Sequence, residues 1–137
     1  MKKVYDAELI KYITLLESIG KVRIKDLFQH NGMLCCIVDK NDVSILVGSG
    51  GMKIRKIQNM LNRKIKVVGF SHNIKEFVKD FIYPTIVDDL EEDNGCLILH
   101  CKDRKTKGLL IGRGGKGLFD LQAVVSRYFK IDSVKVK

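Results

Sequence analysis

The chain has 137 residues, of which 45% are hydrophobic and 30% charged, and its formal net charge is +9. This composition predicts a soluble globular protein, and the length allows one domain or two small units. No apolar run approaches the roughly 20 residues that a membrane span needs, and the N-terminal residues MKKVYDAELI lack a signal-peptide core. We therefore expect a cytoplasmic protein with no membrane partner.

The beginning of the chain predicts a helix followed by two strands. Apolar residues recur at helical spacing over 6–19, and Gly20 then provides a stop signal. Residues 21–28 (KVRIKDLF) alternate between apolar and polar as a strand does, and 33–38 (MLCCIV) are a short apolar run suited to a buried strand. The pair Asn31-Gly32 between them predicts a turn.

The next segment predicts two helices joined by glycines, and then a third strand. One or two helical turns are expected over 42–47, because three residues at or before its start can cap a helix: Asp39, Asn41 and Asp42. After the glycines, residues 52–63 are amphipathic, with one apolar face formed by Ile54, Ile57, Met60 and Leu61. Residues 65–70 (IKVVGF) are rich in β-branched side chains and predict a strand.

The second half of the chain repeats this order. A helix is expected over 73–83, ended by Pro84, and a strand near 85–90. The acidic residues EEDNG (91–95) predict a turn before the strand CLILHC (96–101). The last three elements are a short helix near 105–111, a longer helix over about 115–129 and a strand at 132–137.

The two halves also match residue by residue around their glycines. VGSGGMKI at 47–54 returns as IGRGGKGL at 111–118, an offset of 64 positions that continues without a gap. At this offset identical residues pair as Gly48 with Gly112, Gly50 with Gly114, Gly51 with Gly115, Gln58 with Gln122, Arg63 with Arg127 and Lys66 with Lys130. The chain is therefore interpreted as a duplication, with one unit at 1–71 and the other at 72–137. Because only Ser71 and His72 separate their elements, we expect the units to keep a fixed relation.

Charges are segregated along the chain. Residues 43–75 contain no Asp or Glu but carry seven Lys and Arg, and residues 104–119 are likewise basic and free of acids. The acids gather instead at 88–93, which we expect to be a solvated hairpin. A basic, acid-free zone around both glycine motifs is the electrostatic footprint expected for phosphates, so we predict a nucleic-acid partner.

Each glycine tetrad joins a short helix to a longer one. Without side chains there, a nucleic-acid backbone can approach the main chain, and the next helix N-terminus offers N–H groups and a positive dipole end. The pattern [IV]-G-x-x-G-x-x-[IL], present at 47–54 and 111–118, resembles the GxxG motif of KH domains in their type II arrangement. Two such domains with almost no linker resemble the archaeal NusA-like transcription factors.

The resemblance implies an α/β (α+β) fold of two tandem type II KH domains, each with helices packed on a small mixed three-stranded sheet. It implies that each GxxG loop clamps about four nucleotides of single-stranded RNA. By this resemblance such a factor acts on nascent transcript in transcription elongation, termination or antitermination, with RNA polymerase as a candidate partner. The RNA-binding residues carried over from the motif or close to it are Gly48, Ser49, Gly50, Gly51, Lys53, Arg55, Lys56, Gly112, Arg113, Gly114, Gly115 and Lys116.

The two loops differ in their variable middle pair. KH loops commonly carry a basic residue there, an expectation that Arg113 meets and Ser49 does not. We therefore expect the second loop to hold phosphate more strongly. Few aromatic residues are expected near the loops, so bases should be recognised by hydrogen bonds and apolar contacts more than by stacking.

Other classes of function remain as alternatives. Gly112, Gly114 and Gly117 satisfy G-x-G-x-x-G with Asp132 following 20 residues after the first glycine, as in dinucleotide-binding enzymes, but Asp132 precedes its strand. A zinc site would draw on Cys35, Cys36, Cys96, Cys101 and His100. Because no C-x-x-C pair exists, we expect the cysteines to be buried and reduced, with no metal bound. We also expect neither a cofactor nor an enzymatic activity. A ribosome- or rRNA-associated KH protein and a protein-interaction scaffold are the remaining alternatives, and a monomer is favoured.

Overall fold

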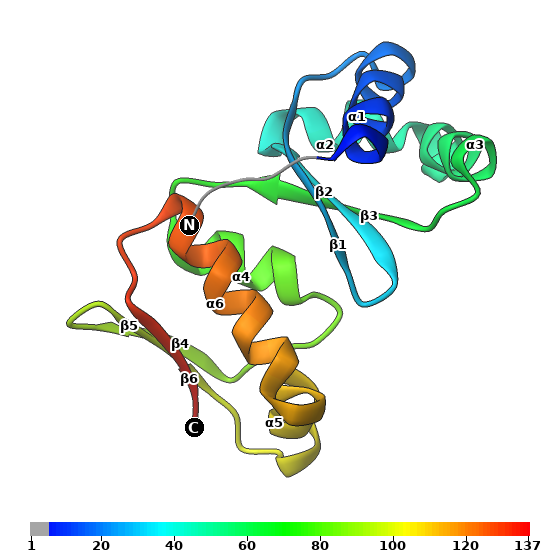
Figure 1. The fold of residues 1–137 in the computed structure, drawn as a ribbon. Helices are drawn as coiled ribbons and strands as arrows, with labels where there is room; N and C mark the ends of the chain where they lie inside the picture. The colour runs from blue at the N-terminus through cyan, green and yellow to red at the C-terminus, as the bar shows by residue number, and fades with distance from the viewer. Residues whose placement is uncertain (1–5) are drawn as a thin grey trace. The chain divides into compact units, whose positions relative to one another are not determined.

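The computed structural model describes residues 6–137 and divides the chain into two compact units, one ending at His72 and the other running from Asn73 to Lys137 (Figure 1). Each unit contains helices and one three-stranded sheet with an antiparallel and a parallel strand pair. The predicted α/β class is therefore confirmed, and the arrangement is that of two tandem KH-like units. Within residues 6–137 no helix has the length and apolar character needed to cross a membrane.

The first unit begins with helix α1 (Ala7–Gly20). The Asp6 carboxylate caps its N-terminus by accepting a hydrogen bond from the Leu9 N–H at 2.8 Å, and Lys21 ends it in the left-handed region, with φ of 60°. Strand β1 (Ile24–His30) therefore begins three residues later than the alternation over 21–28 predicts. Its turn into β2 (Met33–Asp39) consists of Asn31 and Gly32, both with positive φ, as the Asn-Gly pair predicts.

The remaining elements of this unit position the first glycine loop. A single 3-10 turn (Lys40–Asp42) leads into α2 (Val43–Val47), and the loop Ser49–Gly51 leads into α3 (Met52–Leu61). Strand β3 (Ile65–Phe70) then pairs in parallel with β2, giving the strand order β1-β2-β3. Helices and sheet share one core, whose buried members include Leu16, Leu27, Leu34, Cys36, Val38, Leu46 and Ile57.

The second unit repeats this order with its own sheet. Its elements are α4 (Ile74–Ile82), β4 (Asp89–Asp93), β5 (Cys96–His100), α5 (Arg104–Ile111), the turn Arg113–Gly115, α6 (Lys116–Tyr128) and β6 (Ser133–Val136). Strand β5 pairs antiparallel with β4 and parallel with β6. Phe77 of α4 is fully buried, and its ring centre lies 6.3 Å from that of Phe81, 5.9 Å from that of Tyr128 and 5.8 Å from that of Phe129.

The acidic segment 91–95 is mainly strand and not the turn that its composition predicts. Glu91–Asp93 belong to β4 and pair with β5, and the turn consists of Asn94 and Gly95 alone. Acidic residues have low strand propensity, but pairing with the buried strand β5 overrides that preference while their side chains stay in water. The strand expected near 85–90 correspondingly starts only at Asp89.

The ungapped match between the halves is wrong beyond the helices that follow the glycines. The Gln58 side chain accepts a hydrogen bond from the Ile65 N–H in β3, but Gln122 accepts its bond from Val134 in β6, 69 positions after Ile65. Helix α6 has 13 residues where α3 has 10, and the connection after it is longer too. Arg127 and Lys130 are therefore not structural counterparts of Arg63 and Lys66.

The sequence pattern wrongly places Met60 on the apolar face that packs against the core. Ile57 is fully buried, and Ile54 and Leu61 pack against the core, but the Met60 side chain is 56% exposed. In the second unit the aligned residue, Val124, is 3% exposed. The outer side of α3 therefore presents apolar surface that its counterpart on α6 does not.

Candidate nucleic-acid interface

The first glycine loop has a backbone that only glycine adopts readily. Gly48 has φ of 78° and ψ of 174°, and Gly50 and Gly51 follow in the left-handed region with φ of 60° and 79°. The Gly48 N–H donates to the Ser44 carbonyl at 2.9 Å, and the Gly51 N–H donates to the Gly48 carbonyl at 3.2 Å. These bonds end α2 and start α3 within one tight turn.

The second loop has the same conformation. Gly112, Gly114 and Gly115 have φ of 73°, 63° and 79°, each within 5° of its counterpart in the first loop. The Gly112 N–H donates to Gly108 at 2.9 Å and the Gly115 N–H to Gly112 at 3.2 Å, which reproduces both bonds of the first loop. The two loops that the sequence aligns at an offset of 64 therefore have matching backbone geometry.

The first glycine of each loop is needed for packing. A Cβ on Gly48 would lie 2.7 Å from the Lys53 Cβ, and a Cβ on Gly112 would lie 2.8 Å from the Gly117 backbone nitrogen. Real contacts are not that short, so these positions let the loop close against the first turn of the next helix. Their role is to shape the loop.

The third position of each loop is open. A Cβ on Gly50 or Gly114 would meet no atom within 4 Å, and both residues are exposed together with Ser49 and Arg113 beside them. No side chain caps the helix that follows, since Gly51 and Gly115 occupy the cap positions of α3 and α6. A phosphate can therefore approach the main chain here, toward the positive end of each helix dipole.

The predicted basic residues do not all face the loops. Arg113 and Lys116 are exposed at the second loop and the first turn of α6, and Arg55 and Lys56 are exposed on α3. Lys53 differs, because it is half-buried and its Nζ lies 3.4 Å from the Gly20 carbonyl at the end of α1. Its ammonium group thus supports the C-terminus of α1, where a positive charge is stabilising.

Arg55 lies closer to the first loop than its sequence position suggests. A Cβ on Gly51 would be 3.3 Å from the Arg55 Nη1 atom, so the guanidinium group folds back over the end of the loop. Together with Met52, Lys56, Asn59 and Met60 it lines an open surface depression of about 510 Å³ along α3. The structure thus brings cationic and apolar groups together beside this loop.

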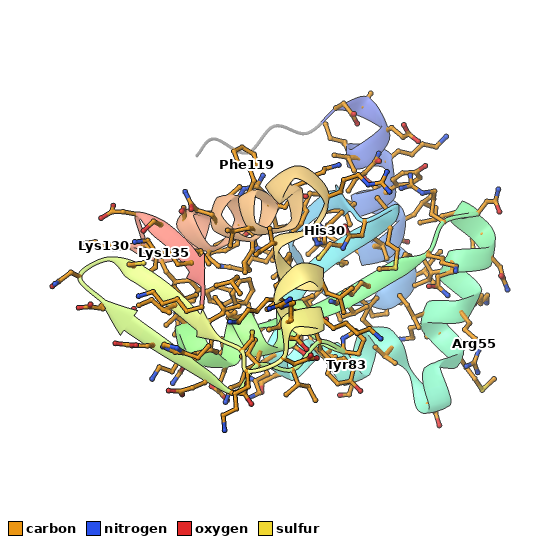
Figure 2. The ribbon with its side chains drawn as sticks, turned by 90° about the horizontal axis from the view of Figure 1, so that it is seen from below. His30, Arg55, Tyr83, Phe119, Lys130 and Lys135 are labelled. Carbon is orange, nitrogen blue, oxygen red and sulfur yellow. The ribbon has the colours of Figure 1, made fainter. Side chains whose placement is uncertain are left out.

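Sequence reasoning missed the exposed apolar residues near the loops. Phe119, labelled on α6 in Figure 2, is 69% exposed. Ile45 and Leu109, which align with each other on α2 and α5, are also exposed. A helical projection of residues 116–128 contains the signal, because Phe119 falls outside the stripe of Leu121, Val124 and Val125 that is buried. Because the sequence predicts few aromatic residues near the loops, Phe119 was not identified from it.

The groups that suggested other chemistry are placed differently. Across residues 6–137 no three His, Cys, Asp or Glu side chains gather to hold a metal ion. All four cysteines are free thiols; Cys35, Cys36 and Cys101 are buried, and burial raises the pKa of Cys36 to about 12. Asp132 packs at the β4–β5 turn, where its N–H donates to the Gly95 carbonyl at 2.7 Å.

No family model matches the chain. Curated relatives named probable transcription termination protein NusA are similar over nearly its whole length. That from Halococcus morrhuae is 21% identical over 93% of each chain, and that from Thermoplasma acidophilum is 22% identical over 96% of this chain and 94% of its own. The protein from Methanocaldococcus jannaschii is 24% identical over 94% of this chain and 72% of its own. The crystal structure of a protein named APE1850 has the same fold, with a TM-score of 0.68, 24% identity, and coverage of 97% of this chain and all of its own.

Proposed function

We propose that this chain is a NusA-like transcription factor that binds single-stranded RNA, specifically nascent transcript, through its two glycine loops. In this proposal residues 1–71 and 72–137 are two type II KH domains, and each loop holds a short stretch of the RNA backbone. The contact residues are those of the two loops together with Arg55, Lys56 and Lys116, and Lys53 contributes through its backbone.

One observation carries the proposal. Two loops with matching dihedral angles and matching hydrogen bonds each expose a glycine backbone at the N-terminus of a helix that no side chain caps. A backbone that admits close approach, next to a positive dipole end and exposed cations, is suited to phosphodiester groups. The absence of Asp and Glu over 43–75 and 104–119 supports this, because a carboxylate there would repel phosphate.

The step from RNA binding to transcription rests on the relatives. Relatives named probable transcription termination protein NusA match 93–96% of this chain, and not a single motif. RNA polymerase is accordingly the protein partner that the proposal includes.

The test is to crosslink the full chain to RNA in the cells it comes from and to sequence the RNA recovered. We expect nascent transcripts, with recovery lost when Ser49 and Gly50 together with Arg113 and Gly114 are all replaced by Asp. Recovery of mainly ribosomal RNA would contradict the transcriptional role. Recovery of no RNA above that of the substituted chain would contradict RNA binding altogether and favour a protein-interaction scaffold.

A further inference from the structure

The two glycine loops carry different side chains at one matched position. Arg55 and Phe119 lie 64 positions apart, and each follows the last glycine of its loop by four residues. Both belong to the helix that starts at the loop, α3 or α6, on the side that faces away from the core (Figure 2). The offset of 64 holds here, since both loops have the same backbone and each helix begins at the residue directly after the last glycine of its loop.

In the first unit this position places a charge on the loop. Side chains on a helix lean toward its N-terminus, so a residue four positions after a glycine reaches back over it. The Arg55 Nη1 atom accordingly lies 3.3 Å from where a Cβ on Gly51 would be. One turn earlier stands an apolar side chain, Met52, which is 68% exposed.

In the second unit the order is reversed. The cation comes first, as exposed Lys116, and the large apolar group comes one turn later, as Phe119. A Cβ on Gly115 would meet no atom within 4 Å, so no side chain packs against this glycine as Arg55 does against Gly51. An aromatic ring thus stands in solvent beside an open loop that carries Arg113.

We propose that the two loops, which both hold the RNA backbone, add different contacts beside it: Arg55 binds a phosphate at the first loop, and Phe119 stacks on a base at the second. This inference rests on the proposed RNA-binding function and assigns a role to each loop. A phenyl ring offers a flat face that any unpaired base can cover, whereas a guanidinium group pairs with phosphate oxygens. Stacking the exposed Phe119 ring on a base removes the ring from water, which is favourable. Arg113 and Lys116 supply the positive charge that attracts the strand to this ring.

The occupant of the Phe119 surface is therefore a base of single-stranded nucleic acid. A second copy of this chain that docked through the same surface would bring the same cations, Arg113 and Lys116, toward each other and be repelled. Paired bases expose no free ring face along a duplex, so the surface selects unpaired strands.

The experiment compares two probes on the full chain over salt concentrations from about 50 to about 200 mM. One probe is an unstructured RNA of about ten nucleotides, and the other is a sugar-phosphate backbone of the same length without bases. Phe119→Ala should weaken binding of the RNA by about tenfold or more at every salt concentration and leave binding of the abasic backbone unchanged. Arg55→Gln should weaken both probes and reduce the slope of log K against log salt by about 0.7.

Three further variants keep the result interpretable. Phe119→Leu retains an apolar group without a ring and should bind the RNA as weakly as Phe119→Ala, whereas Phe119→Trp should bind it at least as tightly as the native chain. Ile86→Ala removes another exposed apolar side chain from the same unit, away from the loop sequence, and should change nothing.

The outcomes separate the two proposals. If the native chain binds both probes but Phe119→Ala binds the RNA normally, or loses affinity for both probes equally, the stacking role is overturned while RNA binding stands. The same holds if Phe119→Leu restores native affinity. If the native chain binds neither probe, the proposed function itself fails.

Discussion

The side-chain oxygen Oε1 of Gln58 accepts a hydrogen bond from the backbone N–H of Ile65 at 2.9 Å, which ties α3 to the start of β3. Gln122 makes the corresponding bond to Val134 at 3.1 Å in the second unit. These glutamines align in sequence although the residues they hold do not. One side chain therefore anchors the third strand in both units despite the different lengths of the preceding helices.

Replacing Gln58 with Met should destabilise the first unit by about 1–2 kcal/mol, because the partly buried Ile65 N–H would lose its acceptor. Urea unfolding and hydrogen exchange at the Ile65 amide measure this. Gln58→Glu keeps an acceptor oxygen and is the matched control, which should protect the amide better than Met does. Equal exchange at Ile65 in the native chain and the Met variant would contradict the anchoring role.

The two kinds of loop glycine should differ in their tolerance of alanine. Gly50→Ala should cost about 1–2 kcal/mol, since its φ of 60° is strained for a side chain but its surroundings are open. Gly48→Ala adds a clash with Lys53 and a backbone region that only glycine favours, so it should cost more than about 3 kcal/mol. Thermal or denaturant unfolding of the two variants decides this, and similar stability for both would refute the distinction.

Replacing Arg113 and Gly114 with Asp should lower RNA affinity by at least about tenfold, because two negative charges would lie where the phosphate is expected. The fold should survive, since a Cβ on Gly114 meets nothing within 4 Å and Asp tolerates a left-handed backbone. Fluorescence anisotropy with a labelled RNA gives the affinity, and circular dichroism verifies folding. Native RNA affinity in the folded double variant would contradict the role of the second loop in binding phosphate.

The cap of α5 should make stability depend on pH in the acid range. The Asp103 carboxylate accepts hydrogen bonds from the Thr106 hydroxyl and the Lys105 N–H, which hold the pKa of Asp103 below its ordinary value of 3.8. Because the folded pKa is the lower one, the cap stabilises the fold above about pH 3.8 and is lost as pH falls through the folded pKa. Native protein and Asp103→Asn should thus differ most well above pH 3.8, including near neutral pH, and the difference in denaturant midpoint should shrink as pH falls below about 3.8. A constant difference would contradict the assignment.

RNA length should reveal whether both loops act on one strand. For RNA of about ten nucleotides, inactivating the first loop with Ser49→Asp and Gly50→Asp should reduce affinity, because one bound loop raises the effective concentration of the strand at the other. For RNA of about four nucleotides, which fills a single loop, the same variant should lose much less. Equal losses for the two lengths would show that the loops work independently.

Local patterns predicted the helices and most strands well. Strand β3 matches its predicted range, and α4 lies within one residue of its own, because Asn73 caps it and Pro84 cannot continue it. The Asn-Gly turns and positive-φ glycines follow from the chemistry of those residues alone. The fold class could be read from the sequence for this reason.

Features that depend on distant contacts could not be predicted. Glu91–Asp93 form a strand only because β5 is there to pair with, and Met60 is exposed only because nothing in the described chain covers it. The sequence predicts that Lys53 binds RNA beside the loop, but in the structure its Nζ lies 3.4 Å from the carbonyl of Gly20, a residue distant in sequence. The sequence alone shows that Arg55 and Phe119 differ at a matched position. That the Arg55 side chain lies against Gly51 could be seen only in the folded structure.

Strand β4 forms one edge of its sheet, and its exposed residues Asp89, Glu91, Glu92 and Asp93 are all acidic. An open sheet edge is a template on which another chain can add a strand and begin to aggregate. Two such edges approaching each other would bring like charges together, which discourages that association at ordinary ionic strength and less so in concentrated salt. The acidic stretch thus disfavours edge-to-edge pairing of this strand between copies of the protein.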